Sequence, residues 1–194
     1  MFQSYFSNYK KEFLETIDSL DVNVIHKIYE TMEEARKNRR QIFLIGNGGS
    51  ASSASHWACD FAKGVNVGES IRFRLIALTD NTPLITAYGN DAEYADIYVE
   101  QLRNLLNPGD VVIGLSVSGH SENIVRAFQY AQDQGAIVIS LIGNRECRMK
   151  DFSDISLVIP SNNYGVVEDA HMYVNHVISQ YIKITNQNKT IETL

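Results

Sequence analysis

The stretch that most constrains the fold is QIFLIGNGGSASSASHWACDFAKG, residues 41–64. Its apolar residues 42–45 are typical of a buried strand, which breaks at the glycine-rich segment 46–50. The small residues that follow predict a helix carrying His56 and Asp60. A helix N-terminus offers unpartnered N–H groups and a positive dipole end, and glycine lets a ligand approach the backbone closely. This stretch therefore predicts a phosphate pocket with ionisable groups inside the helix.

Apolar runs and helical patterns alternate along the rest of the chain. We expect strands over 73–78, 111–115, 136–142 and 155–159, and helices over 82–88, 93–106, 121–134 and 165–185. The pattern predicts an α/β fold, a three-layer sandwich in which helices cover both faces of a five-stranded parallel sheet. Ligands of such sheets collect at the carboxyl ends of the strands near a reversal of strand order. The loops after the first and third strands should therefore share one mouth.

Two amphipathic helices precede the first strand, one over 2–20 and one that Asp21 can cap. They do not fit the alternation of a parallel sheet. They can pack across one end of the domain or against a second subunit, and the presence of Phe and Tyr residues so close to the terminus favours the subunit.

Composition excludes some classes of partner. The 194 residues, 44% of them hydrophobic, suit one domain, and the net charge of −6 argues against nucleic acid as the main partner. The basic cluster 36–40 sits where a helix should end and is explained by the helix dipole. Two cysteines without a motif predict a reduced, cytoplasmic chain, and we expect no membrane partner because no signal peptide or long apolar span is recognisable.

The loop after the third strand carries three serines, Ser116, Ser118 and Ser121, just before a helix. Hydroxyl and backbone N–H donors can satisfy a phosphate without lysine, and no P-loop motif is present, which favours a phosphorylated metabolite over ATP with magnesium. Alternatively the serines merely cap a helix and fill a turn. The glycine loop at 46–50 favours the ligand interpretation.

His56 and Asp60 lie four residues apart, so their side chains meet on one face of a helix. The pair can bind a divalent metal or share a proton, or it can be a surface pair that contributes a few tenths of a kcal/mol. The last helix carries Glu168 and His176, about 80° apart around its axis and about 12 Å apart along it. One straight helix would struggle to bring both onto a single ion. His171 and His26 are interpreted as structural.

The remaining inventory favours proton transfer. The chain has no dinucleotide fingerprint, no recognisable cysteine nucleophile and no G-x-S-x-G elbow. A phosphate pocket with carboxylates and histidines can move a proton between adjacent carbons of a sugar phosphate, and a metal would stabilise the enediolate.

These motifs resemble the sugar isomerase (SIS) domain superfamily and, within it, the phosphoheptose isomerases, which act on sedoheptulose 7-phosphate. GNGGSAS…H…D, TAYGND, GLSVSGHSEN and EDAH…H follow that family in order and spacing over nearly the whole chain. The resemblance implies a single SIS domain over 1–194, with an N-terminal helical arm (1–38) for oligomerisation, a phosphosugar-binding core (39–186) and a tail (187–194). It also implies a homotetramer with sites at subunit interfaces.

The resemblance also assigns roles by position. Asp60 would be the catalytic base and His176 the acid of an aldose–ketose isomerase, and zinc would bind His56, Asp60, Glu168 and His176. The residues that would bind the sugar phosphate are Asn47, Gly48, Gly49, Ser50, Asn90, Asp91, Ser116, Val117, Ser118, Ser121 and Glu168.

The chain departs from the family pattern at four of these motif positions. Asp60 stands in place of glutamate, Glu168 of glutamine, Gly165 of aspartate and Val117 of threonine. The alternative to an isomerase is therefore a non-catalytic SIS protein, which senses a phosphosugar or acts as a protein-binding adaptor. An adaptor has no need of four ionisable groups at the family's catalytic positions, which favours the enzyme.

Overall fold

The computed structural model describes residues 1–143 and 146–192, the last four of them by their backbone alone. Its centre is one sheet of five parallel strands in the order β2-β1-β3-β4-β5. The strands are β1 (Gln41–Gly46), β2 (Arg74–Ala77), β3 (Val111–Ser116), β4 (Ile137–Ile142) and β5 (Ile155–Val158). β1 and β3 are buried along nearly their whole length, which explains why their sequences are continuously apolar rather than alternating.

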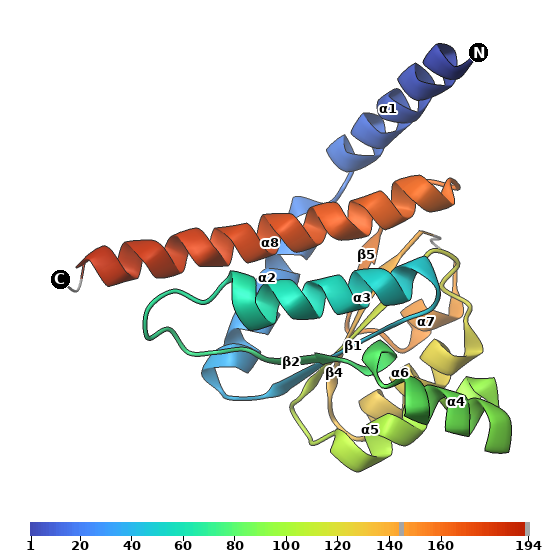
Figure 1. The fold of residues 1–194 in the computed structure, drawn as a ribbon, viewed down its shortest axis with the longest axis vertical. Helices are drawn as coiled ribbons and strands as arrows, with labels where there is room; N and C mark the ends of the chain where they lie inside the picture. The colour runs from blue at the N-terminus through green and yellow to red at the C-terminus, as the bar shows by residue number, and fades with distance from the viewer. Residues whose placement is uncertain (144–145, 193–194) are drawn as a thin grey trace.

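Helices cover both faces of the sheet, so the predicted three-layer α/β sandwich is confirmed (Figure 1). One face carries α2 (Val22–Lys37), α3 (Gly49–Cys59) and α8 (Tyr164–Glu192), which meet the sheet around the fully buried Trp57. The opposite face carries α5 (Val99–Leu105), α6 (Glu122–Asp133) and α7 (Arg148–Asp151), packed around Phe128 and Tyr98. In the described residues no helix combines the length and apolarity needed to cross a bilayer.

The two N-terminal helices differ in how they pack against the rest of the domain. Asp21 caps α2, as predicted, by accepting a hydrogen bond from the Asn23 N–H, and α2 then packs on the sheet. In contrast α1 (Phe2–Asp18) projects from the body and touches it mainly through α8, where the Tyr9 hydroxyl donates to Asp169 at 2.6 Å (Figure 1). Phe2 and Phe6 are exposed, at 77% and 61%. The single chain therefore provides no apolar surface to cover these rings.

Several predicted boundaries need correction. The helix predicted over 93–106 is a 3₁₀ turn, Tyr94–Asp96, followed by α5, and the helix predicted over 82–88 extends through Asp91 as α4 (Thr82–Asp91). The last helix continues past residue 185 to Glu192, while 193–194 of the predicted tail lie outside the described residues. α3 is prolonged by a five-residue π turn, Asp60–Gly64, which periodicity did not predict.

The strand order places a switch point between β1 and β3. From β1 the chain crosses to β2 on one side, and it returns to add β3 on the other. Adjacent parallel strands whose connections leave in opposite directions open a crevice at their carboxyl ends. The glycine loop after β1 and the serine loop after β3 border this crevice.

His171 lies in the core between α8 and the sheet, with no exposed surface. Burial disfavours the imidazolium and lowers the pKa of His171 from 6.5 to about 4. The position of His171 thus agrees with the interpretation of this histidine as structural. Its imidazole is buried in the neutral form.

We expect the protein to lose stability as the pH falls from 6.5 towards 4, because the unfolded chain binds a proton at His171 that the folded chain does not accept. This one group should cost on the order of 3 kcal/mol at the acid end of that window. Urea titrations across the window should show a flatter dependence of the unfolding free energy on pH for His171→Leu. The exposed His26→Leu is the control and should keep the native slope; an unchanged slope in His171→Leu would contradict the assignment.

Candidate functional site

The first loop turns from β1 into α3 within three residues. Gly48, the N-cap of α3, has φ +54°, a conformation that favours glycine. At Gly46 a Cβ atom would lie 2.6 Å from the carbonyl oxygen of Ser50, so only glycine lets the strand end approach the helix start this closely. The first turn of α3 therefore faces the carboxyl end of the sheet, with its N–H groups free of side-chain caps.

The second loop presents the three predicted serines between β3 and α6. Ser116 Oγ accepts a hydrogen bond from the Gly119 N–H at 3.0 Å, and Ser118 Oγ accepts one from the His120 N–H at 3.3 Å. Ser121 occupies the N-cap of α6 but makes no side-chain capping bond. A serine hydroxyl that accepts from the loop still has its own O–H to donate. The turn-filling and ligand-binding interpretations of these serines are thus compatible.

Both loops line a single pocket of about 320 Å³, so the prediction of a shared mouth is confirmed. Its volume suits a small metabolite. The lining residues are Asn47, Gly48, Gly49, Ser50, Leu115, Ser116, Val117, Ser118, Ser121, Tyr164 and Glu168. Glu168 enters from the start of α8 and lies against Gly49, where a Cβ atom would be 2.3 Å from its Oε1.

Asn47 is held at the pocket by a partner that sequence reasoning missed. Asn123 is 2% exposed and exchanges two amide hydrogen bonds with Asn47, at 2.9 and 2.8 Å. The Tyr94 hydroxyl donates a further bond to Asn47 Oδ1 at 3.2 Å. The signal was available in the sequence, since Asn123 is a polar residue on the core-facing side of an amphipathic helix.

A second cluster of polar groups lies farther along α3, where this helix runs side by side with α8 (Figure 1). Asp60 Oδ2 is 3.5 Å from His56 Nε2 and 3.6 Å from His176 Nε2, and the two Nε2 atoms are 3.4 Å apart. Trp57 anchors the pair of helices by donating from Nε1 to the carbonyl oxygen of His171 at 3.3 Å. The expected meeting of His56 and Asp60 is confirmed, and α8 adds His176 to them.

These three side chains have the donor types and spacing of a metal site. Imidazole nitrogen and carboxylate oxygen are ordinary zinc ligands, and tetrahedral bonds of about 2.0–2.1 Å separate ligand atoms by roughly 3.4 Å. The observed separations of 3.4–3.6 Å fit that geometry. Three protein ligands would leave one coordination position open, as in catalytic rather than structural zinc sites.

Other predicted site residues lie apart from this cluster. Glu168 is on the same helix as His176, but within the described residues the group of potential metal ligands holds His56, Asp60 and His176 without it. Asn90 and Asp91 lie at the end of α4, where the Asn90 amide donates to Asp91 at 2.7 Å, and neither lines the loop pocket. One chain thus carries both the loop pocket and the ionisable cluster, while Asn90 and Asp91 are exposed to solvent.

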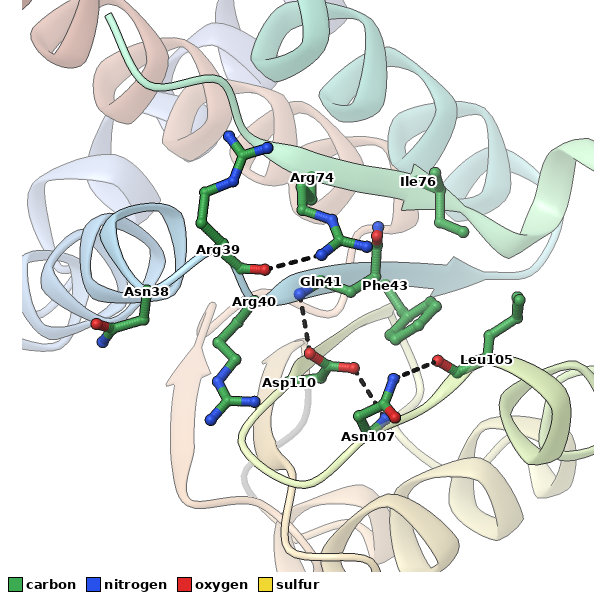
Figure 2. Close-up of a pocket in the computed structure, with 10 residues that line it drawn as sticks. All are labelled: Asn38, Arg39, Arg40, Gln41, Phe43, Arg74, Ile76, Leu105, Asn107 and Asp110. Carbon is green, nitrogen blue, oxygen red and sulfur yellow. Dashed lines mark hydrogen bonds between the residues drawn. The ribbon is translucent and has the colours of Figure 1, made fainter.

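A second hollow lies at the opposite edge of the sheet, near the amino ends of β1 and β2 (Figure 2). Arg39, Arg40 and Arg74 contribute to it, but Figure 2 shows the side chains of Arg39 and Arg40 pointing in opposite directions. Arg74 donates to the Arg39 carbonyl oxygen at 3.0 Å, and Asp110 accepts from the Gln41 N–H at 2.9 Å. These contacts tie strand ends together rather than converge on an anion, so the pocket between the loops is the candidate site.

Comparison with known proteins agrees with this geometry. The family model described as SIS domain matches residues 4–143. The chain is 33% identical over 173 residues to a phosphoheptose isomerase of Helicobacter pylori strain P12, covering 89% of this chain and 88% of that protein. It is 37% identical over 179 residues to the one of Aliarcobacter butzleri, covering 89% and 94%.

This chain belongs to the phosphoheptose isomerase family of SIS-domain proteins. The fold agrees as well, since the phosphoheptose isomerase of Neisseria gonorrhoeae superposes with a TM-score of 0.84 at 27% identity, over 93% of this chain and 95% of that one. The resemblance deduced from the loop motifs is therefore confirmed. The match to the SIS domain ends at residue 143, so α8, which carries Glu168 and His176, lies beyond the matched residues.

The close approach at Gly46 gives a direct test of the first loop. Gly46→Ala should push the start of α3 away from β1 and weaken binding of inorganic phosphate by about tenfold or more, since a contact of 2.6 Å with backbone cannot be relieved by a side-chain rotation. Isothermal titration with phosphate measures the effect. Gly89→Ala, where a Cβ atom would meet only Tyr94 at 4.0 Å, is the control. Equal phosphate affinity in Gly46→Ala and the native protein would contradict this account of the loop.

Proposed function

We propose that this protein catalyses aldose–ketose isomerisation of a sugar phosphate such as sedoheptulose 7-phosphate, through an enediolate. One observation carries the proposal: the phosphate pocket and the ionisable cluster lie on the same pair of helices. Gly49 and His56 are seven residues apart, so they share a face of α3 and are separated by about 10 Å along its axis. An extended sugar phosphate held by its terminal phosphate would present its carbonyl end at the cluster.

The phosphate group would be bound by the N-terminus of α3 and by the serine loop. Backbone N–H groups at Gly48, Gly49 and Ser50 and hydroxyls at Ser116, Ser118 and Ser121 supply the donors. Asn47, Val117 and Glu168 border the same pocket and would orient the sugar. We retain Asn90 and Asp91 as sugar-binding residues by the family resemblance.

Asp60 is the proposed base and His176 the proposed acid. Asp60 removes a proton from C1 of the ketose, the electron pair forms the C1–C2 double bond, and the C2 oxygen gains a proton from His176. Return of the proton from Asp60 to C2, while the C1 hydroxyl gives its proton to His176, yields the aldose. Asp60 Oδ2 and His176 Nε2 are 3.6 Å apart, so both groups can face the same pair of adjacent carbons.

The residues that would hold zinc are His56, Asp60 and His176. The family resemblance adds Glu168, which would take the coordination position that these three leave open. A bound zinc ion would supply Lewis-acid stabilisation of the negative charge that develops on the sugar oxygens. The protein's own contribution is the spacing of the two imidazoles and the carboxylate.

The proposed assembly is a cytoplasmic homotetramer with sites at subunit interfaces. Exposed aromatic and aliphatic side chains gather on two helices, and such residues are enriched in the cores of interfaces. On α1 they include Phe2, Tyr5 and Phe6, and on α8 they include Tyr164, Tyr173, Val177, Tyr181 and Ile184. Tyr164 also lines the phosphate pocket, which couples assembly to the site.

Asp60→Asn should abolish isomerisation and leave sugar-phosphate binding intact, because the amide cannot accept the C1 proton while the loops are unchanged. NMR observation of C1 proton exchange in sedoheptulose 7-phosphate measures turnover, and calorimetry measures binding. Asp133→Asn, at the exposed end of α6, is the matched control and should keep native turnover. Full turnover by Asp60→Asn would remove Asp60 as the base, and an inactive native protein over a panel of sugar phosphates would remove the function itself.

Light scattering should give a mass four times the 21.9 kDa of one chain. Phe6→Asp on α1 should shift the protein towards smaller species and lower its activity in parallel, because the charge would have to be buried against the partner chain. The same substitution at a polar position of that helix, Gln3→Asp, serves as the control. A Phe6→Asp monomer with native activity would exclude interface sites.

A further inference from the structure

A buried amide touches the carboxylate to which the proposed function assigns proton transfer. Asn175 lies on α8 directly before His176 and has no exposed surface. Its Nδ2 donates to Asp60 Oδ2 at 2.6 Å, closer than the nitrogens of His56 and His176, which lie at 3.5 and 3.6 Å from that oxygen. A short bond to an ionised acceptor is stronger than one between neutral groups.

The carbonyl oxygen of the same amide group has no such partner among the described residues. Asn175 Oδ1 is buried and makes no hydrogen bond to any of the described residues. Leaving a buried acceptor unsatisfied is costly, whereas a leucine, which has the same branching at Cγ, would carry no unsatisfied polar atom. Stability alone therefore does not account for asparagine at this position, and its Nδ2 contact with Asp60 remains as the reason.

The backbone around Asp60 makes an external support necessary. Asp60 is the first residue of the π turn Asp60–Gly64, where the regular spacing of α3 is interrupted. Its side chain is 26% exposed, and the two imidazole nitrogens that face it, at 3.5 and 3.6 Å, are beyond the usual length of a hydrogen bond. A short carboxylate on an irregular turn needs a fixed donor to keep one orientation.

An amide suits this task chemically. It donates a hydrogen bond to the carboxylate without carrying a positive charge, and it cannot lose its proton to the base. A charged donor at the same place would oppose release of the carboxylate for reaction. The neutral Asn175 amide orients Asp60 and leaves it able to accept a proton.

We infer that Asn175 is a positioning residue that fixes the carboxylate of Asp60 for proton abstraction, an inference that rests on the proposed isomerase function. Asn175 acts through Asp60 and does not itself touch the sugar. Displacement of a reacting group by about 1 Å can cost about a hundredfold in rate, so loss of this contact should appear in kcat rather than in KM.

Asn175→Leu should lower kcat by about tenfold to a hundredfold and leave KM within about twofold of the native value. Its melting temperature should not fall, because the substitution also removes the unsatisfied Oδ1. Asn186→Leu is the matched control: Asn186 is a second buried asparagine on α8, whose amide donates to the Val65 carbonyl oxygen at 3.1 Å. That variant should lower the melting temperature and keep kcat.

A double-mutant cycle separates positioning from a general effect on the site. In an Asp60→Glu background the carboxylate extends one methylene beyond the Asn175 amide, so Asn175→Leu should change kcat by less than about twofold there. Equal losses of kcat in both backgrounds, or a native kcat in the single variant Asn175→Leu, would overturn the inference.

A spectroscopic experiment tests the contact between Asn175 and Asp60 independently of catalytic turnover. In TROSY spectra of the ¹⁵N-labelled protein, the Asn175 side-chain amide protons should be protected from exchange with solvent, and Asp60→Ser should shift them. Resonances indifferent to Asp60→Ser would overturn the inference even in an active enzyme. An inactive native protein with a shifted Asn175 amide would instead locate the failure in the proposed function.

Discussion

The parallel packing of α3 against α8 is the contact on which the site depends. Both helices lie on the same face of the sheet, and the fully buried Trp57 joins them through its bond to the His171 carbonyl oxygen. Because the helices run in the same direction, their starts meet at the phosphate pocket and their later turns meet at the ionisable cluster (Figure 1). This one packing arrangement thus assembles both the pocket and the cluster, each from two helices whose contacting residues lie more than 100 positions apart in the chain.

The two ends of this helix pair carry different kinds of polar groups. At the loops, backbone N–H groups and hydroxyls surround a space that suits an anion, and a helix dipole adds to their effect without any lysine. Among the described residues that line this space, Glu168 is the one that carries a carboxylate, and it lies against Gly49. At the cluster, the Asp60 carboxylate, whose side chain is 26% exposed, faces two imidazole nitrogens at 3.5 and 3.6 Å. Separation along the helices would keep the charge of a bound phosphate away from Asp60, the proposed base.

How far the sequence predicted this arrangement varies by element. Largely apolar runs predicted the five described strands, most clearly for β1 and β3, since a strand buried on both faces must be apolar throughout. Helix ends were less accurate: the pattern over 93–106 did not reveal the break before Val99, and no periodicity signals the π turn at Asp60. The loops and the pair His56–Asp60 were found because their residues are close in sequence. Asn123 and Asn175 were missed, because their partners lie 76 and 115 residues away.

The sequence by itself determined the layers of the fold, the two loops that border one crevice, and the family, because each depends on local spacing and on residue type. Only the tertiary structure decided which polar groups meet. His176 could have faced any neighbour of a long helix, and the distance between α3 and α8 placed it beside Asp60. The sequence specifies the chemistry of each side chain, but the distance between two helices follows from how their buried side chains fill the space between them.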